Sequence, residues 1–406
     1  MIQGMVGKVP AGDLQPVRLM GVINLSRESF YKGSVAGPDE ALSTAEAMQD
    51  EGADLIDLGA VSTAPGSPPV DEAQEKERLF PALKEVLDNL EIEVSVDTQR
   101  ASIADKALSL GAGCINDVSG LQDPLMAGTV ANYDGSLIIM ASRQRPGDLQ
   151  SLDQIIPLLG ERLRYAVEEG VSLSKISVDP GVGKWIPEKT PAHDLAILNG
   201  FQRLRSLDRP VVAALSRKSF IGAALSLPDP SQRLSGTLAA TAIAVYLGAH
   251  IVRTHDISAS LDTVRMAQAI RGRLAAAKGD AIDVEVLGIL GQGEDLAETF
   301  RRTQVDEHGM GGLCKKSSFR ILAVRGLSSM EALIIKQEML ARGGDAAIPR
   351  LALRCDPRPE EVLIFGTVSQ ISGLMKNLKG QPFRLQQVAS AMEDALDELD
   401  SPERYR

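Results

Sequence analysis

The sequence is poor in cysteine and in aromatic residues. Its 406 residues include three cysteines and one tryptophan, and only 3% are aromatic. Because Cys114, Cys314 and Cys355 are odd in number and lack the spacing of metal ligands, we expect neither disulfides nor a structural zinc site. Cys114 falls inside an apolar run and is expected to be a buried core residue.

The chain also lacks a stretch of about 20 apolar residues, which a membrane-spanning helix would need. The segment from Met1 to Pro16 does not have the basic and then apolar order of a signal peptide. The net charge of −11 argues against a nucleic acid as partner. We therefore expect a cytoplasmic protein that binds neither nucleic acid nor membrane.

Apolar, strand-like runs alternate with amphipathic helical stretches over roughly the first 275 residues. The eight predicted strands are residues 18–24, 54–59, 93–97, 114–116, 136–140, 175–179, 211–215 and 251–253. Eight strand and helix pairs within about 250 residues predict an α/β fold, the (β/α)8 TIM barrel. An open doubly wound sheet is the alternative, but the turn after the first strand lacks the glycine fingerprint of that fold.

Chemically distinctive residues stand at or just after the ends of these predicted strands. Because all strands of a parallel barrel end at one face, these residues are expected to converge on one pocket. They are Asn24, Thr63, Asp97, Asn116, Met140, Asp179, Lys218, Arg253 and His255. Asp97, Asn116 and Asp179 suit the polar edge of a flat heterocycle, since carboxylates accept hydrogen bonds and an amide both donates and accepts them. A phosphate or diphosphate would suit Asn24, Thr63, Arg253 and His255.

A run with two cations and two hydroxyls, residues 216–222, follows the seventh predicted strand and opens a helix. Arg217, Lys218, the hydroxyls and the free N–H groups of the first helical turn together predict an anion pocket. A basic helix cap with solvated side chains is the alternative.

A series of short motifs resembles the dihydropteroate synthase family, in the family's order and over about residues 16–275. The motifs are residues 20–24 with 28–30, 62–66, 95–98, 115–118, 179–183, 216–222, 236–239 and 253–256. Such a series is highly specific although each member is weak. The resemblance implies a transferase of pterin biosynthesis. It would condense 6-hydroxymethyl-7,8-dihydropterin diphosphate with an arylamine, normally 4-aminobenzoate, and release diphosphate.

The resemblance also implies roles for single residues. The pterin edge would be held by Asp97, Asn116, Asp179 and Lys218, with Met140 as an apolar wall. The diphosphate would be bound by Asn24, Thr63, Arg253 and His255, and Asn24 would also hold Mg²⁺. Since the pterin methylene becomes cationic as diphosphate leaves, the expected catalytic residues are Asp97, Asp179, Lys218 and Arg253. The arylamine side would include Ser219, Phe30 and Lys32. Members of this family are commonly dimers, so we expect a homodimer.

Several of these residues have a structural alternative. Asp97 could cap the next helix, and Asn116 could belong to a turn. Met140 could be plain core packing. His255 could be a structural histidine, and Ser219 a residue of a first helical turn.

Three loops depart from the family pattern. An acidic position of the first loop is Lys32 here, and the usual arginine of the second loop is Ala64. The loop after Asp179 is longer by three residues and carries the only tryptophan, Trp185. These changes fall on the side of the second substrate, so we hypothesise an acceptor other than plain 4-aminobenzoate, such as the ribosylated or phosphorylated arylamine of methanopterin-type pterins. The added positive charge would come from Lys32, Lys184 or Lys189.

The chain exceeds one barrel by about 130 residues, so a second domain is expected. The last barrel helix is expected to run out through residues 275–281, which gives a barrel of residues 1–278 and a smaller C-terminal α/β domain of residues 279–406. In the latter we predict strands 284–290, 319–324, 346–353 and 361–366 and helices 328–342, 369–378 and 385–399. We find no catalytic residues there and expect a role in packing or dimerisation.

Two other functions stay open at this stage. A pterin-dependent methyltransferase also binds a reduced pterin in a barrel, but has no need of the cluster of Lys218, Arg253 and His255. A pterin-binding homologue without turnover would suit the altered loops. Release of diphosphate separates both from a synthase.

Overall fold

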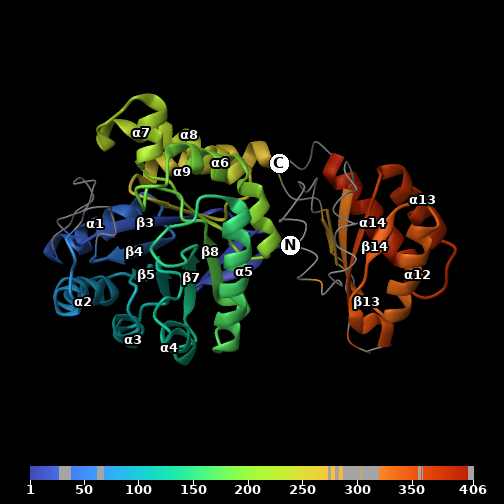
Figure 1. Ribbon diagram of the computed structural model, residues 1–406, viewed down its shortest axis with the longest axis horizontal. Coiled ribbons are helices and arrows are strands. Elements are labelled where there is room, and N and C mark those ends of the chain that lie inside the picture. The colour runs from blue at the N-terminus through green and yellow to red at the C-terminus, as the bar shows by residue number, and fades with distance from the viewer. Residues whose placement is uncertain are drawn as a thin grey trace. The chain divides into compact units, whose positions relative to one another are not determined.

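The chain folds into two compact units, residues 1–270 and 271–406, in the computed structural model (Figure 1). The structure describes residues 1–26, 38–61, 68–272, 276–278, 283–286, 303, 320–354, 358 and 360–400. None of its described helices is both long enough and apolar enough to cross a membrane.

The first unit is built on eight parallel strands in the order β8-β7-β6-β5-β4-β3-β10-β9. They are β3 (Arg18–Asn24), β4 (Leu55–Gly59), β5 (Glu93–Asp97), β6 (Cys114–Asp117), β7 (Ser136–Met140), β8 (Ile176–Asp179), β9 (Val212–Ala214) and β10 (Ile251–Thr254). A parallel bridge between Val178 and Val211 joins β8 to the β9 side and brings the two ends of the sheet together. The predicted TIM barrel is thus confirmed, with the strands at the predicted places.

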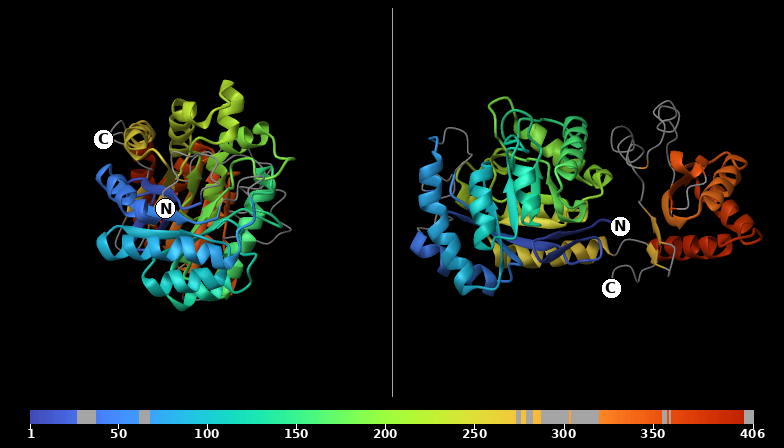
Figure 2. Two further views of the ribbon diagram at one scale, coloured as in Figure 1. Left: turned by 90° about the vertical axis from the view of Figure 1, so that its left-hand side faces the viewer. Right: turned by 90° about the horizontal axis from the view of Figure 1, so that it is seen from below.

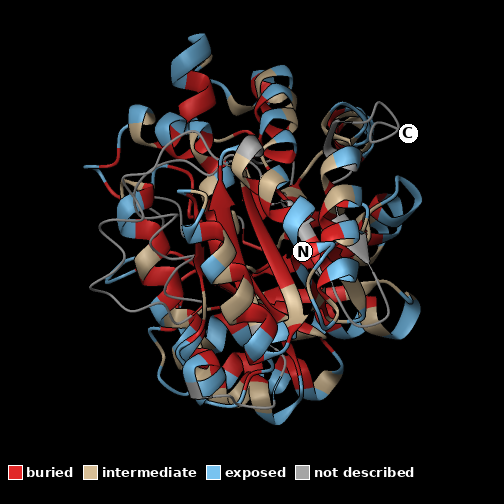
Figure 3. Cartoon of the chain, turned by 90° about the vertical axis from the view of Figure 1, so that its right-hand side faces the viewer, coloured by how far each residue is buried: buried red, intermediate tan, exposed pale blue. Residues whose placement is uncertain are grey.

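Helices connect the strands and cover the outside of the barrel (Figure 2). They are α1 (Pro38–Asp50), α2 (Glu72–Asn89), α3 (Ala101–Leu110), α4 (Met126–Asn132), α5 (Leu152–Glu168), α6 (Pro191–Asn199), α7 (Ser219–Leu225), α8 (Leu234–Tyr246) and α9 (Ile257–Arg271). Helix α2 starts at a capping box, in which Asp71 and Gln74 each accept the other's backbone N–H. The barrel strands are buried, whereas the barrel helices also carry exposed residues. Figure 3 shows the same contrast between buried strands and partly exposed helices in the second unit.

An antiparallel hairpin of β1 (Gln3–Val6) and β2 (Val9–Gly12) lies at the amino-terminal end of the barrel strands. Its Val6 and Ala11 pack on Met20, Leu55 and other side chains near the strand starts. Cys114 belongs to this cluster and is fully buried, as expected for a core residue. The hairpin therefore closes this end of the barrel, and a ligand site is left to the carboxyl-terminal end.

A buried ionic cluster fastens the segment after the hairpin. Both guanidinium ends of Arg205 donate to Asp13, at 2.7 and 3.0 Å, and His250 Nε2 lies 3.0 Å from the same carboxylate. The backbone N–H of Ile2 also donates to Asp13, at 2.7 Å. Although burial raises the pKa of Asp13, Arg205 and His250 hold it well below its usual value.

The second unit is an antiparallel five-stranded sheet in the order β11-β12-β13-β15-β14. The strands are β11 (Ala276–Lys278), β12 (Asp283–Val286), β13 (Arg320–Leu327), β14 (Asp345–Ala347) and β15 (Glu360–Gly366). One apolar face of this sheet packs against three helices, α12 (Ser329–Leu340), α13 (Val368–Leu378) and α14 (Leu385–Asp400). This is the smaller α/β domain predicted from the sequence.

Two sequence predictions about this region are wrong. The last barrel helix, α9, ends at Arg271, and residues 276–278 form β11, which pairs with β12 of the second unit. The predicted barrel limit at 278 thus falls inside the second unit. The predicted strand 346–353 is also too long: β14 ends at Ala347, and Arg350–Arg354 is a 3-10 helix. Pro349, which has no N–H to donate, lies between the two.

Candidate functional site

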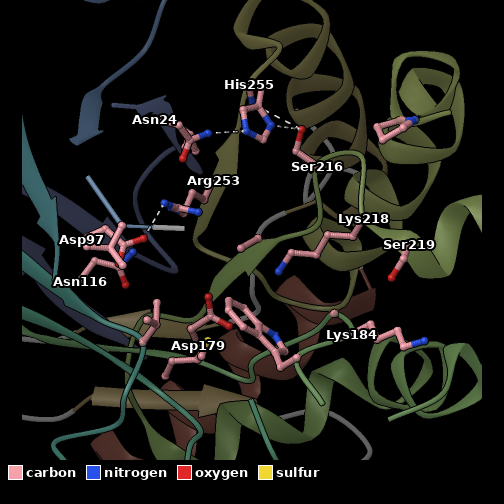
Figure 4. Close-up of a pocket in the computed structure, with 18 of the residues that line it drawn as sticks. Asn24, Asp97, Asn116, Asp179, Lys184, Ser216, Lys218, Ser219, Arg253 and His255 are labelled. Carbon is pink, nitrogen blue, oxygen red and sulfur yellow. Dashed lines mark hydrogen bonds and ion pairs between the residues drawn. The ribbon is translucent and has the colours of Figure 1, made fainter. Parts of the chain in front are cut away.

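A cavity of about 400 Å³ opens at the carboxyl-terminal end of the barrel strands (Figure 4). Most of the residues predicted for the site line it: Asn24, Asp97, Asn116, Met140, Asp179, Lys218, Ser219, Arg253 and His255. Thr63, Phe30 and Lys32 lie outside the described residues, so their roles stay predictions. The barrel therefore brings together side chains that are more than 200 residues apart in the chain.

Arg253 on β10 joins two carboxylates on one side of the cavity. Its Nη2 donates to Asp97 Oδ2 at 3.0 Å, and its Nε donates to Asp57 Oδ2 at 2.7 Å. Asn116 Nδ2 donates to the same Asp57 oxygen at 3.1 Å. Sequence reasoning missed Asp57, although a single carboxylate within the buried strand β4 was a detectable signal.

Asp97 has a strongly perturbed acidity. Desolvation raises its pKa to about 7, although Arg253 lowers it, and the charge of Asp57 raises it further. The alternative in which Asp97 caps the next helix is not supported, because Arg100 occupies the N-cap position of α3. The first N–H of that helix, on Ala101, donates instead to Asp123 at 2.8 Å.

Asn116 and Met140 line the cavity and are both buried. The turn expected as an alternative for Asn116 is made by its neighbour Asp117. The carboxylate of Asp117 accepts the N–H groups of Ser119 and Leu121 at 2.7 and 2.8 Å. The amide of Asn116 is thereby left to the cavity and to Asp57.

Asp179 and Lys218 face one another across the cavity (Figure 4). Burial raises the pKa of Asp179, and the ammonium of Lys218 lowers it. Lys218 Nζ donates to the backbone oxygen of Val182 at 2.5 Å and lies 5.2 Å from the ring centre of Trp185. Burial lowers the pKa of Lys218 to about 8, so this ammonium loses its proton at a modestly alkaline pH.

His255 is neutral at pH 7, because burial and the nearby charge of Arg253 lower its pKa to about 3. Its Nδ1 lies 2.9 Å from Ser216 Oγ, and its Nε2 lies 3.5 Å from Asn24 Nδ2. The imidazole therefore offers hydrogen bonds rather than charge. The positive charge on this side of the cavity comes from Arg253.

Arg217 does not contribute to the predicted anion pocket. It is buried and directs Nε and Nη2 to the carboxylate of Asp256, at 2.9 and 2.6 Å. Its Nη1 donates to the backbone oxygens of Pro230 and Ser231. Of the two cations in the run 216–222, Lys218 alone lines the cavity, and the expectation for Arg217 is wrong.

Lys189 is not available to an acceptor substrate either. Its side chain is 0% exposed, and Nζ donates to the backbone oxygen of Gly181 at 2.6 Å and lies 3.7 Å from Asp194 Oδ1. Asp194 Oδ1 in turn accepts the N–H of Gly183 at 2.8 Å. Lys189 thus fastens the loop after β8. Lys184, in contrast, is exposed at the edge of the cavity, with its amino group directed away from Asp179 (Figure 4).

The described residues could bind a metal ion only together with a bound substrate that supplies further oxygen atoms. No group of three or more histidine, cysteine, aspartate or glutamate side chains among them could hold a metal ion. Asn24 offers a single amide oxygen at the end of β3. Mg²⁺ is usually held by one or two protein oxygens with phosphate oxygens and water, so this donor set fits an ion that is shared with a diphosphate.

Comparison with known proteins shows to which family the chain belongs. The family of pterin binding enzymes matches residues 20–255, more than half of the chain. The dihydropteroate synthase of Bacillus subtilis is 37% identical over 254 residues, which cover 62% of this chain and 88% of that protein. The dihydropteroate synthase of Synechocystis is 34% identical, with 62% and 89% covered.

Solved structures agree with these relatives. A dihydropteroate synthase from Coxiella burnetii in complex with pteroic acid is 31% identical, covers 67% of this chain and 99% of its own, and has a TM-score of 0.60. The Xanthomonas albilineans enzyme with 4-aminobenzoic acid is 32% identical, covers 64% and 98%, and has a TM-score of 0.58. The family match ends at residue 255, so the whole second unit, residues 271–406, lies outside it. The chain therefore belongs to the pterin binding enzymes, the family of the dihydropteroate synthases.

Proposed function

We propose that this protein is a dihydropteroate synthase-type transferase. It condenses 6-hydroxymethyl-7,8-dihydropterin diphosphate with 4-aminobenzoate or a related arylamine and releases diphosphate. The observation that carries the proposal is one cavity in which Asp97, Asn116 and Asp179 meet Lys218 and Arg253 at the carboxyl-terminal end of the barrel. The relatives with solved structures are dihydropteroate synthases that hold pteroic acid or 4-aminobenzoic acid.

The pterin ring would lie deepest in the cavity. Its N–H and C=O edge needs both acceptors and donors, which the carboxylates of Asp97 and Asp179 and the amide of Asn116 supply. Lys218 Nζ adds a donor, and Met140 adds an apolar wall. The cavity volume of about 400 Å³ is of the size that small-molecule sites have.

The reaction breaks the C–O bond between the pterin methylene and the diphosphate. The electron pair leaves with the diphosphate, so positive charge develops on the methylene and ring. Ionised Asp97 and Asp179 stabilise that charge, while Arg253, with His255 and Asn24 beside it, stabilises the departing anion. The arylamine nitrogen then forms the new C–N bond and gives up one proton to solvent. Orientation of the two substrates supplies much of the remaining rate.

We propose Mg²⁺ as the cofactor, held by Asn24 together with the diphosphate oxygens. When bound, the ion neutralises negative charge on the leaving diphosphate. The protein's own contribution there is hydrogen bonding: Asn24 and His255 lie within 3.5 Å of each other on the same side of the cavity. A nearby anion favours the protonated form of an imidazole, so bound diphosphate raises the pKa of His255.

We propose that the preferred acceptor is an arylamine other than plain 4-aminobenzoate, with an anionic substituent such as a phosphate; preferential turnover of 4-aminobenzoate would contradict this. Among the described residues that line the cavity, an acceptor could contact the ring of Trp185, the hydroxyl of Ser219 and the exposed ammonium of Lys184. An aromatic ring can pack on the first, and a carboxylate or phosphate can pair with the other two. Lys189, which the sequence suggested as a further cation, is excluded by its burial and its pairing with Asp194.

We also propose that the protein is a homodimer. Helix α8 carries no charged residue, and its outer side exposes Ile243 and Tyr246 by about half. Met266 of α9 is 62% exposed. Apolar helix faces of this kind are typical of contacts between subunits. Sedimentation of the purified chain tests the dimer, and fractionation of the native cells tests the predicted cytoplasmic location.

The function is tested by incubating the chain with dihydropterin diphosphate, Mg²⁺ and a panel of arylamines, with and without carboxylate or phosphate substituents. We expect equimolar diphosphate and a pteroate-type product, identified by mass. Affinity for the pterin without any product would favour a pterin-binding homologue. Methyl transfer from a reduced pterin, with no diphosphate released, would favour a methyltransferase.

A further inference from the structure

We propose that Asp57, which does not line the cavity, is a positioning residue of the pterin site: it orients the amide of Asn116 and shares the guanidinium of Arg253 with Asp97. The proposal rests on the proposed pterin-binding function. Asp57 lies in the middle of β4, and its side chain is 0% exposed. Its influence on a ligand must therefore pass through the residues that it contacts.

The first contact decides which atom Asn116 presents. An ionised carboxylate only accepts hydrogen bonds, so the Asn116 atom that lies 3.1 Å from Asp57 Oδ2 must be the NH₂ group. The amide oxygen of Asn116 is then left as an acceptor for an N–H group of the pterin edge. Without the carboxylate, the amide could rotate by half a turn and present a donor instead.

The second contact divides the charge of Arg253. Its Nε donates to Asp57 at 2.7 Å, while its Nη2 donates to Asp97 at 3.0 Å. One guanidinium thus binds two carboxylates: that of Asp97, which lines the cavity, and that of Asp57, which does not. Asp57 binds part of the cation and adds a negative charge nearby, so Asp97 takes up a proton more readily than it would beside Arg253 alone. The charges of Glu75 and Asp117 also raise the pKa of Asp97, and both residues stay unchanged in the variants below.

Replacement of Asp57 by asparagine keeps the shape of the side chain and removes its charge. We measure the affinity of the Asp57→Asn chain for 6-hydroxymethyl-7,8-dihydropterin from about pH 5 to about pH 9, a range that spans the Asp97 pKa of about 7, with no second substrate. Two changes are expected. At pH 8, where Asp97 is ionised in both proteins, the affinity falls about tenfold, because Asn116 loses its fixed orientation. The acid limb, which lies near the Asp97 pKa of about 7 in the unaltered protein, moves down by about one pH unit.

The matched control is Asp54→Asn. Asp54 immediately precedes β4, and its carboxylate is paired with Arg18 at 2.9 Å near the opposite end of the barrel. The same chemical change there should leave both the pterin affinity and the acid limb where they are. A merely structural effect of Asp57→Asn would weaken binding at every pH without moving the limb.

Asp57→Glu covers the case in which Asp57→Asn does not fold. It keeps the charge but lengthens the side chain, so we expect an acid limb at the original pH and a clear loss of affinity at pH 8. An unmoved limb in Asp57→Asn, or unaltered affinity at pH 8 in either variant, overturns the proposal. If the unaltered chain binds no dihydropterin, it is the proposed function that fails, and the two failures are therefore distinguishable.

Discussion

Replacement of the buried Lys189 by methionine tests whether the loop after β8 depends on a buried ion pair. Lys189 is 0% exposed and is held by the backbone oxygen of Gly181 at 2.6 Å and by Asp194 at 3.7 Å. Lys189→Met keeps the volume of the side chain but leaves Asp194, itself 1% exposed, without its cation.

The size of the effect follows from the burial of the partner. Removing one member of a buried ion pair costs about 3 to 5 kcal/mol, because an uncompensated charge stays behind. For a unit the size of this barrel, that corresponds to a fall in the melting temperature of about 6 to 20 °C. Adding Asp194→Asn removes the stranded charge and keeps an acceptor for the N–H of Gly183, so the double variant should recover most of the loss.

The assay is thermal unfolding followed by the fluorescence of Trp185, the only tryptophan of the chain, which lies in the same loop. Lys184→Met is the control, since Lys184 is an exposed lysine of that loop and its loss should change stability by less than about 0.5 kcal/mol. The reasoning is refuted if Lys189→Met melts within about 2 °C of the control, or if the double variant melts no higher than the single one.

Three further predictions concern the site and the closed end of the barrel. The pH profile of kcat/KM should be bell-shaped, with an acid limb near 7 from Asp97 and a basic limb near 8 from Lys218, and Asp97→Asn should abolish the acid limb together with about 100- to 1,000-fold of the rate. Trp185→Ala should raise KM for the arylamine about two- to tenfold and leave KM for the pterin diphosphate unchanged in steady-state kinetics. Asp13→Asn should destabilise the protein by about 3 kcal/mol at pH 7 in urea titrations. Because the folded pKa of Asp13 is depressed, its stabilising contribution exists above the unfolded pKa and is lost as pH falls through the folded one, so the difference from the unaltered protein should shrink below about pH 4.

Much of the barrel could be predicted because its strands are short apolar runs that end in polar residues. The convergence of Asp97, Asn116 and Asp179 followed from topology alone, since parallel strands end at one face. The limits of β11 could not be predicted in this way. Residues 276–278 read as helix because alanine and lysine favour helices, yet pairing with β12 determines their conformation.

Side-chain direction accounts for the errors within the site. Arg217 and Lys218 are adjacent in the sequence, and nothing in their spacing tells which of them lines the cavity. Lys189 looked like a solvent-exposed cation because the sequence does not show that the loop folds it against Asp194 of helix α6. Asp57 was overlooked because it lies in the middle of an apolar strand, whose residues are expected to belong to the core. A buried carboxylate needs a polar partner, and this need indicates a site residue.

The β1–β2 hairpin has a consequence for the order of events in turnover. Since it closes the amino-terminal end of the described barrel, reactants and products would enter and leave at the carboxyl-terminal end. Whatever binds deepest has to enter first, so a pterin bound against Asp97 and Asn116 would precede the arylamine. An arylamine in excess would then obstruct the empty enzyme, and initial rates should decline at high arylamine concentration.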